Sequence, residues 1–231
     1  MAPPLHQHTM SKSKTVAEIH KRLDKAFGGE AWDKTRTPSP PLENLMRTIL
    51  SQNTTDKNRD LAYDTMRAQY PTWEKAMRAK PEPFQQSIAV AGLAKQKGPA
   101  MQTFLKWLWA KRGNISLDFL KEIDPEEAIQ TLVQHKGIGI KTAYIVLAFA
   151  CNQDLCAVDT HVHRILQRVG ILNEKCSREK AHSELRPLIP NGKARAFHVN
   201  LLDLGKTICH ARKAPECNVC MLSDLCHYTN K

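Results

Sequence analysis

Two charged residues stand at the starts of predicted helices, where their chemistry would differ from that of ordinary surface side chains. Lys141 follows the glycine turn GIG and opens a predicted helix over 141–151, and Asp159 precedes another helix in the segment AVDTH. The helix dipole, neighbouring basic groups and partial burial all disfavour the ammonium form of Lys141. Such an amine can form a Schiff base with a sugar aldehyde carbon. The alternatives are a surface lysine and an aspartate that only caps its helix.

The spacing of these two residues predicts that they share a site. Asp159 lies 18 residues after Lys141, with one short helix and a loop between the two helix starts. We therefore expect both helix starts to open onto one cleft. A carboxylate near the lysine could assist proton transfer there or stabilise a cationic sugar.

The glycines before Lys141 predict a second chemical property, which is anion binding. Gly137 and Gly139 allow positive φ and close approach of the backbone to another molecule. The unpaired N–H groups at the new helix start, together with the helix dipole, suit a DNA phosphate. We interpret about 126–151 as a helix-hairpin-helix that holds the DNA backbone without reading bases, with Thr142 as a further contact. A plain turn between two helices is the alternative.

Four of the seven cysteines lie in the last 23 residues and predict a metal site. They follow the pattern C-x7-C-x2-C-x5-C, and four thiolates in one short loop can enclose a [4Fe–4S] cluster or a tetrahedral zinc ion. The odd cysteine number and the polar, proline-bearing start argue against a disulfide framework. Spacing alone does not choose the metal. The four residues are Cys209, Cys217, Cys220 and Cys226.

Composition and patterning bound the class of protein. The net charge of +11 and the pI of about 9.4 favour a polyanionic partner, usually nucleic acid. No apolar run approaches the roughly 20 residues that a membrane helix requires. Apolar residues recur at helical spacing in most segments and no period-2 strand is found, so we expect an all-α fold. Helices are expected over 15–27, 42–50, 56–69, 72–79, 84–90, 96–111, 125–134, 141–151, 160–170, 177–188 and 193–208.

Taken in order, these motifs resemble endonuclease III of the helix-hairpin-helix (HhH-GPD) glycosylase superfamily. The segments GIGIKTA, AVDTHVHRI and the terminal cysteine loop carry the resemblance, and LSQNTTDKN and AGL support it. The match spans roughly 15–228. One departure is the first cysteine spacing of seven residues, where six is more frequent in the family.

The resemblance implies a role for each site residue. Lys141 would be the Schiff-base lysine and Asp159 the essential aspartate. Gln52 or Asn53 would fill the gap left by an extruded base, and Leu93 would be the wedge into the opposite strand. His161 is a further candidate DNA contact, and the four cysteines would ligate [4Fe–4S].

The resemblance also implies two helical domains. A six-helix barrel would cover 34–153, and 15–33 with 154–231 would form the cluster domain, with its loop at 209–226. Residues 1–14 are expected to be a mobile tail. DNA and the extruded base would lie in the cleft between the domains.

The implied function is a bifunctional DNA glycosylase with lyase activity that removes oxidised pyrimidines. Its partner would be double-stranded DNA with damaged bases or abasic sites, and the chain would be a cytoplasmic, nucleoid-associated monomer that binds no membrane. Adenine- or mismatch-specific relatives commonly carry Ser or Tyr in place of the lysine, so Lys141 argues against them. A non-catalytic, metal-organised DNA-binding protein and an Fe–S electron carrier are the rival classes. A DNA-binding protein without catalytic activity gives no reason for Lys141 and Asp159 to lie together. An electron carrier does not account for the hairpin.

Overall fold

The structure is a computed structural model that describes residues 11–228. Its regular elements are all helical, and no strand occurs among these residues, so the all-α prediction is confirmed. No helix in this range is long and apolar enough to cross a membrane. Two compact units divide the chain: one takes residues up to Arg36 together with those from Asp154 onward, and the other is Thr37–Gln153.

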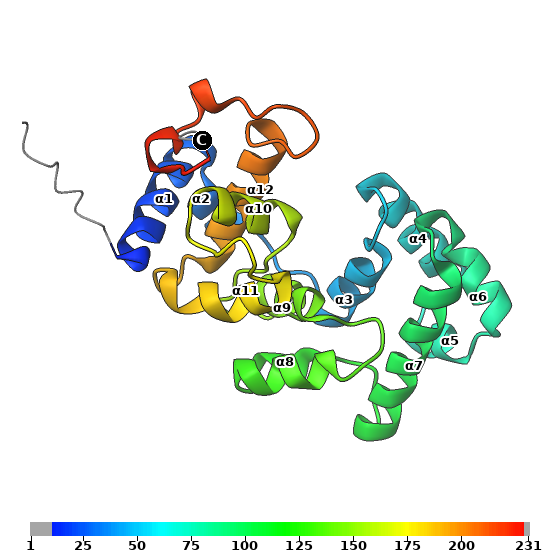
Figure 1. Ribbon diagram of the computed structural model, residues 1–231. Coiled ribbons are helices and arrows are strands. Elements are labelled where there is room, and N and C mark those ends of the chain that lie inside the picture. Colours follow the sequence, from blue (N-terminus) through cyan, green and yellow to red (C-terminus); the bar gives the residue numbers. More distant parts are fainter. Residues whose placement is uncertain (1–10, 229–231) are drawn as a thin grey trace, which may run out of the picture. The chain divides into compact units, whose positions relative to one another are not determined.

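The first unit is built on a long amphipathic helix and the helices that cover it. Helix α1 packs against α12, which also contacts α2 and α10, while α11 packs on α10 (Figure 1). A continuous apolar core runs through these contacts and includes Ile19, Val162 and Phe197. The helices are α1 (Lys12–Phe27), α2 (Gly29–Thr35), α10 (Thr160–Arg168), α11 (Arg178–Leu185) and α12 (Ala194–Thr207), with 3-10 turns η3 (Arg186–Leu188), η4 (Cys217–Val219) and η5 (Ser223–Leu225).

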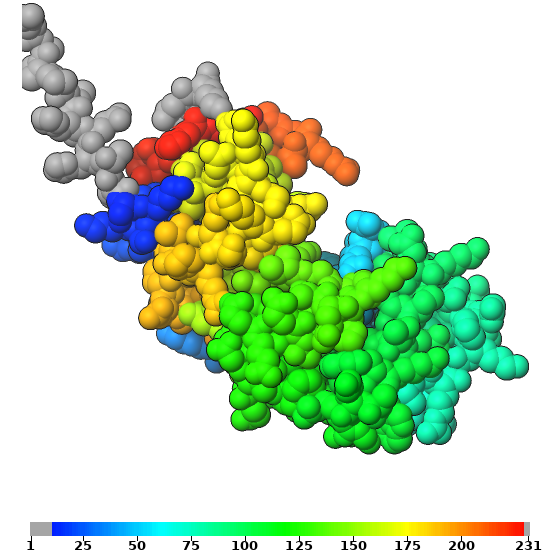
Figure 2. Space-filling model, turned by 60° about the horizontal axis from the view of Figure 1, so that its bottom comes forward, coloured from blue at the N-terminus to red at the C-terminus, as the bar shows by residue number. Residues whose placement is uncertain are grey.

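The second unit is centred on α3 and α9. Helix α3 packs on α9, α4 and α7, and α9 packs on α8 (Figure 1). The apolar face predicted for α3 is confirmed, since Leu42, Leu45, Met46, Ile49 and Leu50 are all buried. Figure 2 shows the green segments of this unit packed into one continuous surface. The helices are α3 (Pro41–Leu50), α4 (Asp56–Gln69), α5 (Trp73–Arg78), α6 (Pro81–Ser87), α7 (Ala94–Arg112), α8 (Pro125–Val133) and α9 (Ile140–Ala150), with 3-10 turns η1 (Ala89–Ala91) and η2 (Asp118–Lys121).

The predicted start of the first helix is wrong. Helix α1 begins at Lys12 rather than at Thr15, because the Ser11 side chain accepts a hydrogen bond from the Lys14 amide and caps the helix. Thr15 lies inside the helix, and its hydroxyl bonds back to the Ser11 carbonyl. Residues 12–14 of the expected mobile tail are therefore helical, while residues 1–10 of that tail lie outside the described part of the chain.

Two other helix limits differ from expectation for identifiable reasons. Pro81 starts α6 instead of ending an element, because proline lacks only an N–H that the first helical turn leaves unpaired anyway. Gly28 ends α1 in the left-handed conformation as expected, but Gly29 begins the unforeseen helix α2. The Gly29 amide donates to Asn200 Oδ1, and a Cβ there would meet that side chain at 2.5 Å, so glycine lets α2 pack closely on α12.

Candidate functional site

A tight turn joins α8 to α9 and leaves the start of α9 without a side-chain cap. Gly137 has φ +88°, and the Ile138 amide donates to the His135 carbonyl at 3.0 Å, which closes the turn. Gly139 is the N-cap of α9, with φ −86°, so the positive φ expected of both glycines occurs only at Gly137. No atom lies within 4 Å of the position that a Gly139 Cβ would take. Glycine there leaves the backbone open to a close neighbour.

Lys141 lies in the first turn of α9 with its side chain exposed. The partial burial expected for Lys141 is therefore wrong. The three residues that follow, Thr142, Ala143 and Tyr144, turn inward and are buried, so the helix presents the lysine on its outer face. No acidic residue lies in the first turn of α9. The amine consequently stands beside an uncapped helix terminus with a positive local dipole.

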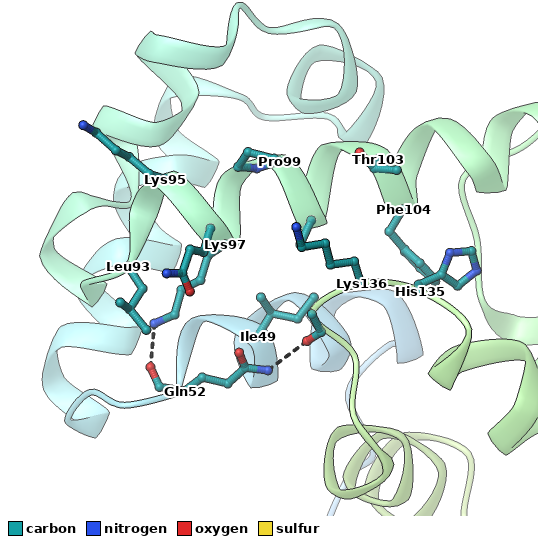
Figure 3. A pocket seen from close by; sticks show the side chains of 13 residues that line it. Ile49, Gln52, Leu93, Lys95, Lys97, Pro99, Thr103, Phe104, His135 and Lys136 are labelled. Carbon is teal, nitrogen blue, oxygen red and sulfur yellow. Dashed lines mark hydrogen bonds between the residues drawn. The ribbon is translucent and has the colours of Figure 1, made fainter.

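The turn after α3 brings Gln52 to the hairpin. Gln52 Nε2 donates to the Gly137 carbonyl at 3.0 Å (Figure 3). The same nitrogen lies 3.5 Å from the hydroxyl of Thr142. The predicted DNA contact Thr142 is thus buried behind Gln52. Asn53 is exposed and has φ +52°, a left-handed conformation that asparagine tolerates better than most residues.

Leu93 occupies an unusual conformation for its type. Its φ is +53°, directly after Gly92 at φ +71°, and its side chain is 45% exposed. A left-handed conformation costs a bulky residue roughly 1–2 kcal/mol. Leu93 is also the N-cap of α7, where its carbonyl accepts from the amides of Gln96 and Lys97.

A pocket lies between α7, the end of α3 and the hairpin (Figure 3). Its apolar wall includes Ile49, Pro99 and Phe104, and the lysine side chains of Lys95 and Lys136 border it. The predicted residues Gln52, Leu93 and Gly137 line the same pocket, so the structure brings these three together. The His135 ring packs on Trp107 and Phe104, with ring centroids 4.4 and 4.9 Å apart. Burial lowers the pKa of His135 and favours its neutral form.

In the other unit, Asp159 is the N-cap of α10. Its Oδ1 accepts from the Val162 amide at 2.8 Å, which confirms the capping contact considered from the sequence. Within residues 11–228 the carboxylate accepts no second side-chain hydrogen bond, so Oδ2 remains available. Asp159 and Lys141 belong to different units.

A strongly basic groove begins at the same helix start. Arg164 Nη2 donates to His161 Nδ1 at 3.2 Å, to the Gly205 carbonyl and to the Cys209 carbonyl at 2.6 Å. Gly205 is required here, because a Cβ would meet the His161 ring at 2.5 Å. His163 faces another way, and its Nε2 bonds to the Cys176 carbonyl at 2.8 Å. The groove is lined by Thr160, His161, Arg164, Gly205, Lys206, His210, Ala211, Arg212 and Lys213.

The four terminal cysteines, predicted as metal ligands, line one small cavity. Burial raises the pKa of the Cys220 thiol, and charge on Cys209, Cys226 and Cys217 raises it further. Arg168 Nη1 donates to Cys209 Sγ at 3.0 Å and to the His210 carbonyl, and its guanidinium lies 4.4 Å over the Tyr228 ring. The remaining cysteines, Cys151, Cys156 and Cys176, are buried elsewhere in the core.

The comparisons with known proteins agree with this geometry. Residues 46–191 match the model of the HhH-GPD superfamily base excision DNA repair proteins. The chain belongs to this superfamily. The match covers the hairpin, Lys141 and Asp159 together.

Relatives of this HhH-GPD protein include an endonuclease III and a plant protein. The chain is 29% identical over 213 residues to endonuclease III of Thermotoga maritima, covering 92% of each chain. It is 30% identical to a putative DNA glycosylase of Arabidopsis thaliana, over 74% of this chain but only 59% of that longer protein. A solved trapped covalent intermediate of endonuclease III with DNA has a TM-score of 0.79 and 25% identity, covering 96% of this chain and 98% of that one. The resemblance to endonuclease III is confirmed.

The donor set of this HhH-GPD protein consists of four thiols, which suit a thiolate-bound metal centre. A tetrahedral zinc with Zn–S bonds of about 2.3 Å holds its sulfurs roughly 3.8 Å apart. Among residues 11–228, no three Cys, His, Asp or Glu side chains are grouped closely enough to hold one metal ion. Yet all four thiols line one cavity, so a group bound there would be held by their thiolates.

The sequence analysis missed two residues that position this site. Arg168 lies on α10 seven residues after His161, on the side of the helix that meets the cysteine loop. Lys97 is buried under the turns that carry Gln52 and Leu93. A signal for Lys97 was present, because it falls at helical spacing with the buried Met101, Phe104 and Leu108 of α7.

Proposed function

We propose that this base excision repair protein is a bifunctional DNA glycosylase and abasic-site lyase that acts on oxidised pyrimidines in duplex DNA. The observation that carries the proposal is the exposed Lys141 amine at the uncapped start of α9. Endonuclease III relatives support the reaction class. The oxidised-pyrimidine preference rests on that relationship.

In the proposed reaction, the protein first removes the damaged nucleotide from the base stack, at a cost of a few kcal/mol. The neutral Lys141 amine attacks C1′ and the C1′–N bond to the base breaks, with the proton delivered to the departing base. Opening of the sugar ring gives the Schiff base. Loss of a C2′ proton then breaks the C3′–O bond and nicks the strand.

We assign Asp159 to the sugar in the same reaction. Its capping bond to Val162 fixes the carboxylate in direction and leaves Oδ2 available to stabilise positive charge on the ring or to assist proton transfer. The role requires Lys141 and Asp159 to meet on one nucleotide. We expect both residues to contact one nucleotide in the DNA-bound protein.

Asn53 is the better candidate to fill the vacated stack. Gln52 is engaged by the Gly137 carbonyl, whereas Asn53 is exposed at the tip of the turn. We assign Leu93, exposed and held in a left-handed turn, to the opposite strand as a wedge. Backbone N–H groups at Gly139 and the basic groove at His161 would hold phosphates on the two units.

Cys209, Cys217, Cys220 and Cys226 would hold the [4Fe–4S] cluster that we propose as cofactor. The loop that bears Arg212 and Lys213 would be fixed by its cysteines when they hold the cluster. These two exposed cations would then be ordered for phosphate contact. A monomer acting at the bacterial nucleoid remains part of the proposal.

The decisive experiment compares wild type with Lys141→Gln on a duplex that contains an oxidised pyrimidine. Borohydride should trap a covalent protein–DNA adduct with wild type and none with the variant, while binding to the duplex changes little. Lys106→Gln, on the exposed side of α7, serves as a lysine-removal control. An equally strong adduct from Lys141→Gln would refute this role. No nicking of abasic DNA by wild type would favour a non-catalytic DNA-binding protein.

A further inference from the structure

Lys97 is a charged side chain in the interior of the Thr37–Gln153 unit. It is only 2% exposed, although lysine is rarely buried without a partner. Its ammonium donates three hydrogen bonds, to the carbonyls of Leu50 at 2.8 Å, Gln52 at 2.7 Å and Ala91 at 2.9 Å (Figure 3 shows the bond to Gln52). Three donors meet three acceptors, so the group is fully satisfied. Burial lowers the pKa of Lys97, because a poorly solvated site disfavours the charged form.

The three acceptors belong to the ends of two separate elements. Leu50 is the last residue of α3, and Ala91 is the last residue of η1. Carbonyls at helix ends lack helical partners and carry partial negative charge, so an ammonium group suits both. The Gln52 carbonyl belongs to the peptide bond that leads into Asn53. Lys97 therefore joins the turn after α3 to the turn before α7.

Both turns hold a residue other than glycine in the left-handed conformation. Among the described residues, only three other than glycine have positive φ, and Asn53 and Leu93 are two of them. Such conformations persist only where the surroundings enforce them. Lys97 contacts both: its ammonium binds the peptide before Asn53, and its own amide donates to the Leu93 carbonyl at 2.9 Å.

We propose that Lys97 is a positioning residue that locks the two DNA-probing turns, so that Asn53 and Leu93 are held ready to enter the duplex together. The inference rests on the proposed function for the roles of Asn53 and Leu93. The new element is that the buried ammonium of Lys97 couples the positions of Asn53 and Leu93. Preorganised turns would enter DNA without first losing conformational entropy.

This role predicts a selective defect. Excision of a damaged base from a duplex requires both turns to displace the base and support the partner strand. Nicking at an abasic site in single-stranded DNA requires only the chemistry at Lys141. A lysine with a purely structural role would lower both rates by the same factor.

The test uses Lys97→Met, which keeps the length and removes the donors, with Lys106→Met on the exposed face of α7 as the matched control. Single-turnover excision from a duplex should fall at least about tenfold, because small displacements of positioning groups have large effects on rate. Nicking of the single-stranded abasic substrate should change less than about threefold, because this reaction does not require the two turns to be positioned in a duplex. Hydrogen exchange should accelerate at the amides of 51–54 and 90–94, and Lys106→Met should match wild type throughout.

Equal losses on both substrates, or unchanged exchange in the two turns, would overturn the inference. If wild type itself neither excises nor nicks, the proposed function fails, and the exchange measurement alone decides whether Lys97 holds the turns. If Lys97→Met does not fold, Lys97→Gln replaces it. The amide of that variant keeps two of the three donors, so its exchange rates should lie nearer to wild type.

Discussion

The glycine hairpin, residues 134–139, and the cysteine loop, residues 209–226, are both irregular segments that face solvent, but they are held in different ways. The hairpin lies between two helices and is closed by its own backbone, by Gln52 and by the buried Ile138. The cysteine loop contains only two short 3-10 turns, and Leu222 is its one buried residue. Its four thiols line a cavity, and Met221 and Leu225 are partly buried against the core of the same unit.

The two segments obtain their order from different sources. A segment with few buried apolar contacts has little local stability of its own. The chain alone supports the hairpin, whereas the cysteine loop is expected to depend on the group that its thiols bind.

The largest expected effect is on the cysteine loop. Cys217→Ser should remove the cluster and lower stability by on the order of 3 kcal/mol, a Tm decrease of about 6–12 °C for a chain of this size. Iron content, visible absorbance and thermal unfolding measure the effect. Cys156→Ala removes a buried thiol of the same unit and should keep full iron content. Full iron content in Cys217→Ser would contradict the ligand assignment.

Gly137→Ala should destabilise the hairpin. Its φ of +88° is unfavourable for alanine, and the new Cβ would lie 2.9 Å from the Ala100 Cβ. We expect a loss of about 2 kcal/mol in urea unfolding, because backbone strain and overpacking add. Iron content should not change. A stability equal to wild type would show that the hairpin is less constrained than its geometry indicates.

Gly139→Ala changes the other glycine of the hairpin, and we expect it to affect DNA binding and not stability. Its φ of −86° suits alanine and its Cβ position is open, so stability should stay within about 0.5 kcal/mol. The added methyl would obstruct approach to the uncapped α9 start and weaken binding to abasic duplex about three- to tenfold. A binding titration measures this effect, and unchanged affinity would exclude phosphate contact at Gly139.

The smallest effect is expected from Glu216→Gln in the cysteine loop. Hydrogen bonding and attraction to Lys213, followed by the His210 contact, hold the pKa of Glu216 below its usual range. Neutralising this exposed carboxylate frees nearby positive charge for phosphate, so DNA affinity should rise about twofold at low salt and less at high salt. Iron content should be unchanged. Weaker DNA binding would show that Glu216 orders the loop.

Much of the fold could be predicted because the helices are strongly patterned. The buried face of α3 and the limits of α4 follow directly from apolar spacing. The error at α2 occurred because a tertiary contact decides the local structure there. Nothing in Gly28-Gly29 indicates α2, because that helix depends on Asn200 and Ala196 more than 160 residues away.

The site was predictable to the extent that its residues lie in compact motifs. The cysteine spacing and the hairpin are local patterns, so their residues could be named in advance. Lys97 binds two carbonyls more than 40 residues away in addition to that of Ala91, and side-chain type alone favours a surface lysine. The exposure of Lys141 also depends on how α9 is turned about its axis, which the apolar run YIVLAFA does not specify.

The left-handed backbone at Leu93 places stability and the proposed DNA-repair activity in conflict. Glycine would relieve the strain at this exposed position, so a screen that rewards heat resistance alone should accept it there. The same exchange would discard the side chain assigned to the opposite strand. Thermostabilised variants of this protein should therefore be sequenced at Leu93 first and assayed for base excision. A stabilising substitution there would remove the proposed wedge.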